Sequence, residues 1–83
     1  NRNDVLLVKE IRCKKNKVKL LVYCKNELKK KLLVDRFIFN EREYYFSKKM
    51  EFKLTKLKKE NTKLCGEIII CEDEFWSYLK NEE

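Results

Sequence analysis

Apolar residues recur at every second position over much of this chain, and that spacing limits the folds open to it. The predicted strands are residues 4–13, 18–25, 31–39, 44–54 and 63–71; in the last of them Ile68, Ile69 and Ile70 are apolar on both faces, which predicts a central or helix-covered strand. Successive side chains of a β-strand point to opposite faces of a sheet, so this period is the one expected of strands. The sequence therefore predicts a mainly β protein, with about five strands in a largely antiparallel sheet.

The first two predicted strands, 4–13 and 18–25, form a hairpin. We predict a two-residue turn at Asn16-Lys17, because Asn tolerates the left-handed conformation that such a turn needs. This turn sets the register of the pair, with Lys15 opposite Val18, Cys13 opposite Leu20 and Ile11 opposite Val22. Apolar side chains are then left over on the other face of the hairpin, at Leu6, Val8, Leu21 and Tyr23.

The second half of the chain continues the alternation with two irregularities. In strand 44–54 the even positions are apolar apart from Lys48, and the phase breaks at Leu57, which predicts a bulge or the end of the strand. Residues 58–62 are predicted to be a turn. Gly66, inside the last predicted strand, indicates a bulge or a close approach of another segment to its backbone.

One helix is predicted, over residues 72–81. Its first three residues are acidic, which suits the positive N-terminal end of a helix, and Asp73 is a candidate cap. Phe75, Trp76 and Leu79 share one face, and we expect all three, Trp76 included, to be core residues. A helix of about ten residues is marginal alone, so its stability depends on packing against the sheet.

The predicted fold is therefore a single small α+β domain spanning residues 1–83. It has an antiparallel sheet of about five strands, with one short C-terminal helix packed on one face. A chain of 83 residues can bury one modest core. The start at Asn1 without Met leads us to expect a domain excised from a larger protein.

Residues for catalysis are scarce. The chain has no His, which removes the commonest general base, the usual partner of Ser and Cys nucleophiles, and the commonest metal ligand. It has one Gly and so lacks a glycine-rich phosphate loop. We therefore predict a protein that is not an enzyme and that uses no cofactor and no metal.

Four cysteines leave three interpretations open. In the predicted strands, Cys13 and Cys24 are offset by about 13 Å, and Cys65 and Cys71 are about 20 Å apart, which exceeds the reach of a disulfide. A cross-pair such as Cys13–Cys71 stays possible. Zinc would need an unusual site, because no C-x-x-C pair is present. Free thiols in a reducing compartment are the reading we favour.

The chain is basic, with 21 Lys and Arg against 14 Asp and Glu, a net charge of +7. Seventeen of the cations are Lys, and Ala, Gln, His and Pro are absent, as is typical of a protein encoded by an AT-rich genome. We therefore expect much of this charge to come from Lys side chains that simply face solvent. The best candidate for binding an acidic partner is a set of exposed positions on and after the fourth strand: Tyr45, Lys48, Lys49, Lys53, Lys56, Lys58 and Lys59.

These features rank the possible functions. A protein–protein interaction or assembly module of a larger protein comes first, because the left-over apolar side chains and the strand edges can bind another chain or a second copy. Binding of single-stranded DNA or RNA by the Lys-rich outer face comes second. Binding of anionic lipid head groups on a membrane surface comes third. We expect no small-molecule substrate.

The segment EIIICEDEFWSYLK, residues 67–80, resembles the last strand and Trp-bearing helix of pleckstrin-homology domains. It is also similar in outline to the closing elements of positive-cofactor-4-type single-strand DNA-binding domains and of polo-box domains. Each resemblance covers only this stretch and one aromatic residue, and a pleckstrin-homology fold implies seven strands. The first resemblance implies head-group binding, and we assign no family.

The longest apolar run is five residues, Leu20 to Cys24. A membrane-spanning helix needs about 20, so none is predicted. No signal-peptide pattern opens the sequence. We therefore expect an intracellular protein, in the cytoplasm or the nucleus.

Overall fold

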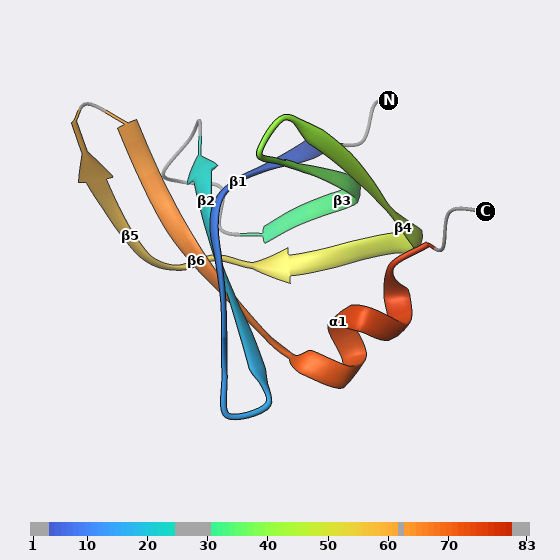
Figure 1. Ribbon diagram of the computed structural model, residues 1–83. Helices are drawn as coiled ribbons and strands as arrows, with labels where there is room; N and C mark the ends of the chain where they lie inside the picture. The colour runs from blue at the N-terminus through green and yellow to red at the C-terminus, as the bar shows by residue number, and fades with distance from the viewer. Residues whose placement is uncertain (1–3, 25–30, 62, 81–83) are drawn as a thin grey trace.

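The computed structural model describes residues 4–24, 31–61 and 63–80. In these residues the chain forms six strands in one sheet and then one short helix (Figure 1). The elements in chain order are β1 (Asp4–Lys14), β2 (Lys17–Cys24), β3 (Lys31–Phe39), β4 (Arg42–Lys53), β5 (Thr55–Glu60), β6 (Lys63–Cys71) and α1 (Glu72–Tyr78).

The strands lie in the order β4-β3-β1-β2-β6-β5. All neighbouring strands are antiparallel except β1 and β3, which are parallel. The prediction of a mainly β domain with a C-terminal helix is confirmed. The prediction of about five antiparallel strands is wrong in both respects, because the sheet is mixed and a sixth strand, β5, begins at Thr55 and runs into the turn predicted at 58–62.

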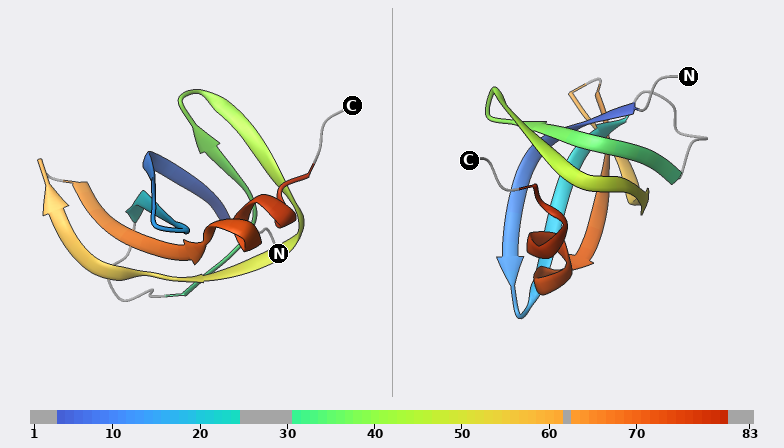
Figure 2. Two further views of the ribbon diagram at one scale, coloured as in Figure 1. Left: turned by 60° about the horizontal axis from the view of Figure 1, so that its bottom comes forward. Right: turned by 90° about the vertical axis from the view of Figure 1, so that its right-hand side faces the viewer.

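β4 and β5 lie at opposite edges of the sheet, although only Leu54 separates them in the chain. A sheet whose two edge strands are consecutive in sequence must curl until its edges meet at one corner. Both views in Figure 2 show this strong curvature. The apolar side chains on the inner face form a single core, made of Leu6, Val8, Val18, Leu20, Val22, Val34, Phe37, Phe46, Met50, Phe52, Leu54, Ile68 and Phe75.

The first hairpin turns at Lys15 and Asn16, one residue earlier than predicted. Both residues have positive φ, 51° and 65°, as a tight two-residue hairpin turn requires. The register moves by two residues relative to the prediction: Cys13 lies opposite Val18, and Ile11 lies opposite Leu20. A shift of two residues keeps every side chain on its face, so the predicted inner face is correct although the pairs are wrong.

A bulge in β1 overturns the prediction for its first half. Val8 pairs with Val22, but Glu10 pairs with Leu21, so Lys9 is an extra residue in β1. An extra residue reverses the alternation of side chains before it. Leu6 and Val8, predicted to remain on the outer face, are instead 1% and 6% exposed in the core.

Helix α1 is shorter than predicted and buries a different aromatic residue. Phe75 is 1% exposed, whereas Trp76, predicted to be a core residue, is 51% exposed. Asp73 does not cap the helix; Cys71 is the N-cap residue, and the Glu72 N–H donates to the Asn16 carbonyl at the hairpin tip, at 2.9 Å. The helix packs against β2, β4 and β6, and thereby covers the core from that side (Figure 1).

The chain becomes extended at Leu79, where the prediction continued the helix; residue 81, the predicted helix end, lies outside the described residues. Leu79 pairs with Phe46 as an isolated bridge, and the Lys80 N–H donates to the Tyr45 carbonyl at 2.8 Å. These contacts cover part of the outer edge of β4. Covering an edge in this way prevents it from pairing with another chain.

The turn between β3 and β4 allows a direct stability test. Asn40 and Glu41 both have positive φ, 55° and 66°, and Glu is poorly suited to that conformation. Glu41→Gly creates an Asn-Gly turn, and we expect it to raise the free energy of unfolding by about 0.5–1 kcal/mol. Asn40→Gly is the control, with a smaller expected change, because Asn already tolerates positive φ. Urea unfolding measures both, and a loss of stability in Glu41→Gly would contradict the turn assignment.

Candidate functional site

The seven predicted binding residues are divided between two strands at opposite edges of the sheet. Tyr45, Lys48, Lys49 and Lys53 belong to β4, and Lys56, Lys58 and Lys59 belong to β5. All seven side chains are exposed. The seven residues do not form one continuous surface, because they contact different neighbours on β4 and on β5.

A large bulge divides the β4 residues. Val34 pairs with Met50 and Arg36 pairs with Tyr45, so residues 46–49 of β4 lie opposite Asp35 alone. The simple alternation that would align Tyr45 with Lys49 and Lys53 is therefore interrupted. The predicted stripe of one aromatic residue and two cations is not a straight row on β4.

Tyr45 belongs to a polar cluster with Arg36 and Glu43. The Tyr45 hydroxyl donates to Glu43 Oε1 at 3.0 Å, and this hydrogen bond raises the pKa of Tyr45. The Arg36 guanidinium lies 5.4 Å from the centre of the Tyr45 ring and also donates to Glu43 Oε2, at 3.2 Å. Its hydrogen bonds to Asp35 and Glu43 raise the pKa of Arg36. One face of the Tyr45 ring is thus occupied by a cation.

Lys48 contacts the helix. Its amino group lies 4.4 Å from the centre of the Tyr78 ring in a cation–π contact. Lys48 therefore links the β4 bulge to α1. The structure does not bring it together with the lysines of β5.

Lys53 lies directly opposite Lys31 at the end of the β3–β4 pair. Like charges opposite each other in a sheet are unfavourable. Lys56, three positions further on, has a φ of 52° and forms the bulge of β5, since Thr55 pairs with Glu67 but Lys58 pairs with Cys65. These cations lie close to the corner where β4 passes into β5.

An apolar surface on the outer face of β1 and β3 was missed by sequence reasoning. Leu7 and Leu33 are 39% and 48% exposed, and Val5 and Ile38 on the same face are half-buried. We call these four residues the β1–β3 patch. The alternation predicts that Leu6 and Val8 lie on the outer face. The bulge at Lys9 brings Leu7 to the surface instead, and no Gly or Pro in the sequence marks that bulge.

The β1–β3 patch has a polar border on β4. Leu7 pairs with Ile38, and Ile38 pairs with Glu43, while Leu33 pairs with Glu51. The cluster of Arg36, Tyr45 and Glu43 therefore lies directly beside the patch. The result is an apolar surface next to an aromatic and a guanidinium group that are already held in place by hydrogen bonds.

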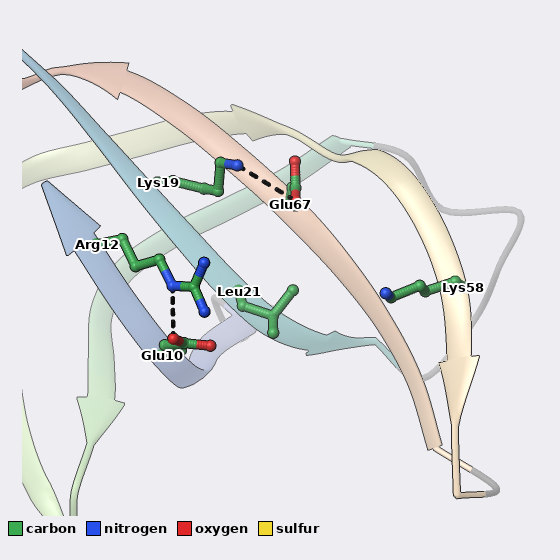
Figure 3. A pocket seen from close by; sticks show the side chains of 6 residues that line it. All are labelled: Glu10, Arg12, Lys19, Leu21, Lys58 and Glu67. Atoms are coloured by element: carbon green, nitrogen blue, oxygen red, sulfur yellow. Dashed lines mark hydrogen bonds and ion pairs between the residues drawn. The ribbon is translucent and has the colours of Figure 1, made fainter. Parts of the chain in front are cut away.

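A second outer surface, over β1, β2, β6 and β5, contains a shallow hollow of about 190 Å³ (Figure 3). Glu10 accepts from Arg12 Nε at 2.6 Å, and Lys19 Nζ lies 3.7 Å from Glu67 Oε2. Glu67 Oε1 is buried and has no hydrogen-bond partner. Leu21 and Lys58 complete the lining, so the hollow holds three cations against two carboxylates.

The four cysteines are unpaired. Cys13 and Cys71 are on strands separated by β2, and two strand spacings amount to about 10 Å, beyond disulfide reach. Burial and the neighbouring Cys65 raise the pKa of the Cys24 thiol. Among residues 4–24, 31–61 and 63–80, no three Cys, Asp or Glu side chains are grouped to hold a metal ion.

Over the same described ranges, no helix has the length and apolar character required to cross a bilayer. In the comparisons with known proteins, no family model, no curated protein and no solved structure matches this chain.

Proposed function

We propose that this domain is a non-catalytic module that binds another protein through the β1–β3 patch. The observation that supports this most directly is the exposure of Leu7 and Leu33 on adjacent strands, 39% and 48%, on a face shared with Val5 and Ile38. Single exposed leucines are ordinary on a protein surface. Two exposed leucines on one face, together with two half-buried apolar residues and a polar border, favour an interaction site.

The border of the patch supports a protein partner. Tyr and Arg are enriched among the residues that contribute most to protein–protein affinity. Arg36 and Tyr45 are held by Glu43 before any partner arrives, so less side-chain entropy is lost on binding. The partner expected here offers apolar side chains to Leu7 and Leu33 and an acceptor to Arg36.

The nucleic-acid alternative has weaker support. Base stacking requires an open aromatic face, and one face of the Tyr45 ring is already covered by Arg36. Lys63 likewise lies 5.1 Å from the centre of the Tyr23 ring. The head-group alternative rested on a resemblance confined to residues 67–80.

The experiment is site-specific photocrosslinking in the cells that make this protein. A photoreactive residue at position 33 is expected to capture a discrete partner, whereas the same residue at Ile69, equally exposed on β6 but outside the patch, is expected not to. With the purified partner, Leu7→Ser with Leu33→Ser should weaken binding about tenfold or more, a loss of about 1.4 kcal/mol. Equal capture at both positions, or no capture at either, would contradict the proposal.

The proposed location of the domain is intracellular. Four unpaired thiols are expected in a reducing compartment, the cytoplasm or the nucleus, where disulfides rarely persist.

A further inference from the structure

We infer that the free edge of β5 binds an extended acidic peptide segment, which adds to the sheet as a further strand. This site is separate from the β1–β3 patch and does not depend on it. β5 is the last strand in the sheet order, and its only strand partner among the described residues is β6 (Figure 1). The backbone N–H and C=O groups on its other edge can therefore pair with an incoming strand.

The lysines of β5 determine which strand can bind. Lys58 pairs with Cys65 and Lys59 pairs with Leu64, so these successive side chains lie on opposite faces of the sheet. Lys58 points to the outer face and lines the hollow with Arg12 and Lys19 (Figure 3). Lys59 lies on the inner face, like Leu57, and its side chain is exposed.

This arrangement selects against a second copy of the same edge. If two β5 edges paired antiparallel in a register centred on Lys58 or on Lys59, that lysine would lie opposite its own counterpart, which is unfavourable. An incoming strand with two adjacent acidic residues would place one carboxylate beside Lys58 and the next beside Lys59. The site therefore favours consecutive acidic residues in the bound strand, because alternating ones would match only one face.

The same geometry favours a peptide over a nucleic acid. A phosphate backbone running over one face of the sheet would reach only one of the two lysines. The regular part of the edge is also short, residues 57–60, because the bulge at Lys56 breaks the strand before it. A short strand of acidic protein chain fits this length.

The test is an amide-resolved NMR titration of the intact domain with a synthetic peptide containing adjacent Glu residues among β-branched residues. Three further probes accompany it: the same peptide with Gln in place of Glu, a version with Pro at its centre, and a single-stranded oligothymidine. We expect shifts centred on residues 57–60 with the Glu peptide. We expect little or no binding by the Gln or Pro versions, since Pro removes a backbone donor.

Matched variants assign the binding to the edge. Lys58→Gln with Lys59→Gln is expected to weaken binding of the Glu peptide about fivefold to tenfold, from two lost cross-strand charge pairs. Lys14→Gln with Lys15→Gln removes the same charge at the distant hairpin tip and should change affinity less than twofold. Leu7→Ser with Leu33→Ser should have no effect, which keeps this site distinguishable from the β1–β3 patch.

Four results would overturn the inference. The Pro peptide could bind as well as the Glu peptide, which would show charge attraction without strand addition. The hairpin-tip variant could lose as much affinity as the β5 variant. The shifts could lie outside β5. Finally, oligothymidine could bind more tightly than the Glu peptide through Lys58 and Lys59, which would make the edge a nucleic-acid site.

Discussion

Phe75→Ala is expected to lower the free energy of unfolding by about 3–5 kcal/mol, the usual cost of deleting a buried Phe side chain. Phe75 is 1% exposed and is the only buried residue of α1. Its ring centre lies 6.0 Å from that of Phe37 and 6.3 Å from that of Phe46, so it joins the helix to β3 and β4. A domain of this size has a total stability of about 4–12 kcal/mol, so the loss is a large part of it.

Trp76→Ala is the matched control for this prediction. Trp76 is the neighbouring aromatic residue and is 51% exposed, with its indole N–H donating to Glu72 at 3.3 Å. We expect a loss of at most about 1 kcal/mol from this variant. Urea unfolding followed by circular dichroism measures both changes. If Trp76→Ala cost as much as Phe75→Ala, the assignment of Phe75 as the residue that attaches the helix would be wrong.

Gly66→Val is expected to lower the free energy of unfolding by about 1–3 kcal/mol through overpacking. A Cβ at Gly66 would lie 2.9 Å from Leu57 Cδ2, 3.2 Å from Cys24 Sγ and 3.4 Å from Leu54 Cδ2. Gly66 does not have a positive φ, so only space, and not backbone conformation, requires glycine there. Gly66→Ala should therefore be milder, because its single methyl group mainly requires a shift of the flexible end of Leu57.

A second substitution distinguishes crowding from a backbone requirement. Leu57→Ala creates room beside Gly66, so it should cost less in the Gly66→Val background than in the wild-type domain. The measurement is a double-mutant cycle of unfolding free energies. Equal losses for Gly66→Ala and Gly66→Val, with no coupling to Leu57, would mean that the backbone itself needs glycine at this position.

Part of the fold could be predicted because it depends on the local pattern of apolar and charged residues. The apolar pattern of 18–25 and 31–39 identifies β2 and β3, the apolar run Ile68–Ile70 identifies β6, and the acidic residues 72–74 mark the start of α1. Gly66 was predicted to mark a bulge or a close approach; the β2–β6 pairing shows no register shift at Gly66, and the side chains of Leu57 and Cys24 lie close to it. These features depend on a few neighbouring residues and on the period of two.

The remaining features depend on contacts between distant segments. The bulges at Lys9 and in β4 reverse or interrupt the alternation, yet neither contains a Gly or a Pro that would mark it. The parallel pairing of β1 with β3 depends on strand order, which periodicity does not determine. The turn predicted at 58–62 overlaps the second half of β5. Lys58, Lys59 and Glu60 are all charged there, a composition that suits a short edge strand as well as a turn.

The candidate site was predicted less well than the fold, for the same reason. All seven residues are exposed, as expected, but exposure does not group them: Tyr45 bonds to Glu43, Lys48 lies over Tyr78, and the β5 lysines are at the other edge. The β1–β3 patch could be found only after the bulge at Lys9 was known. Leu7 then changes from an inner to an outer residue.

The single residue between β4 and β5 has a consequence for how two molecules could combine. If the chain straightened at Leu54, β5, β6 and α1 would leave together, because the parts of the fold on either side of that residue are contiguous in sequence. The same three elements of a second molecule could then occupy the vacated place and restore every contact of the monomer. Leu54 is therefore the expected hinge of a domain-swapped dimer, in which the two molecules exchange β5, β6 and α1 and form no new kind of contact.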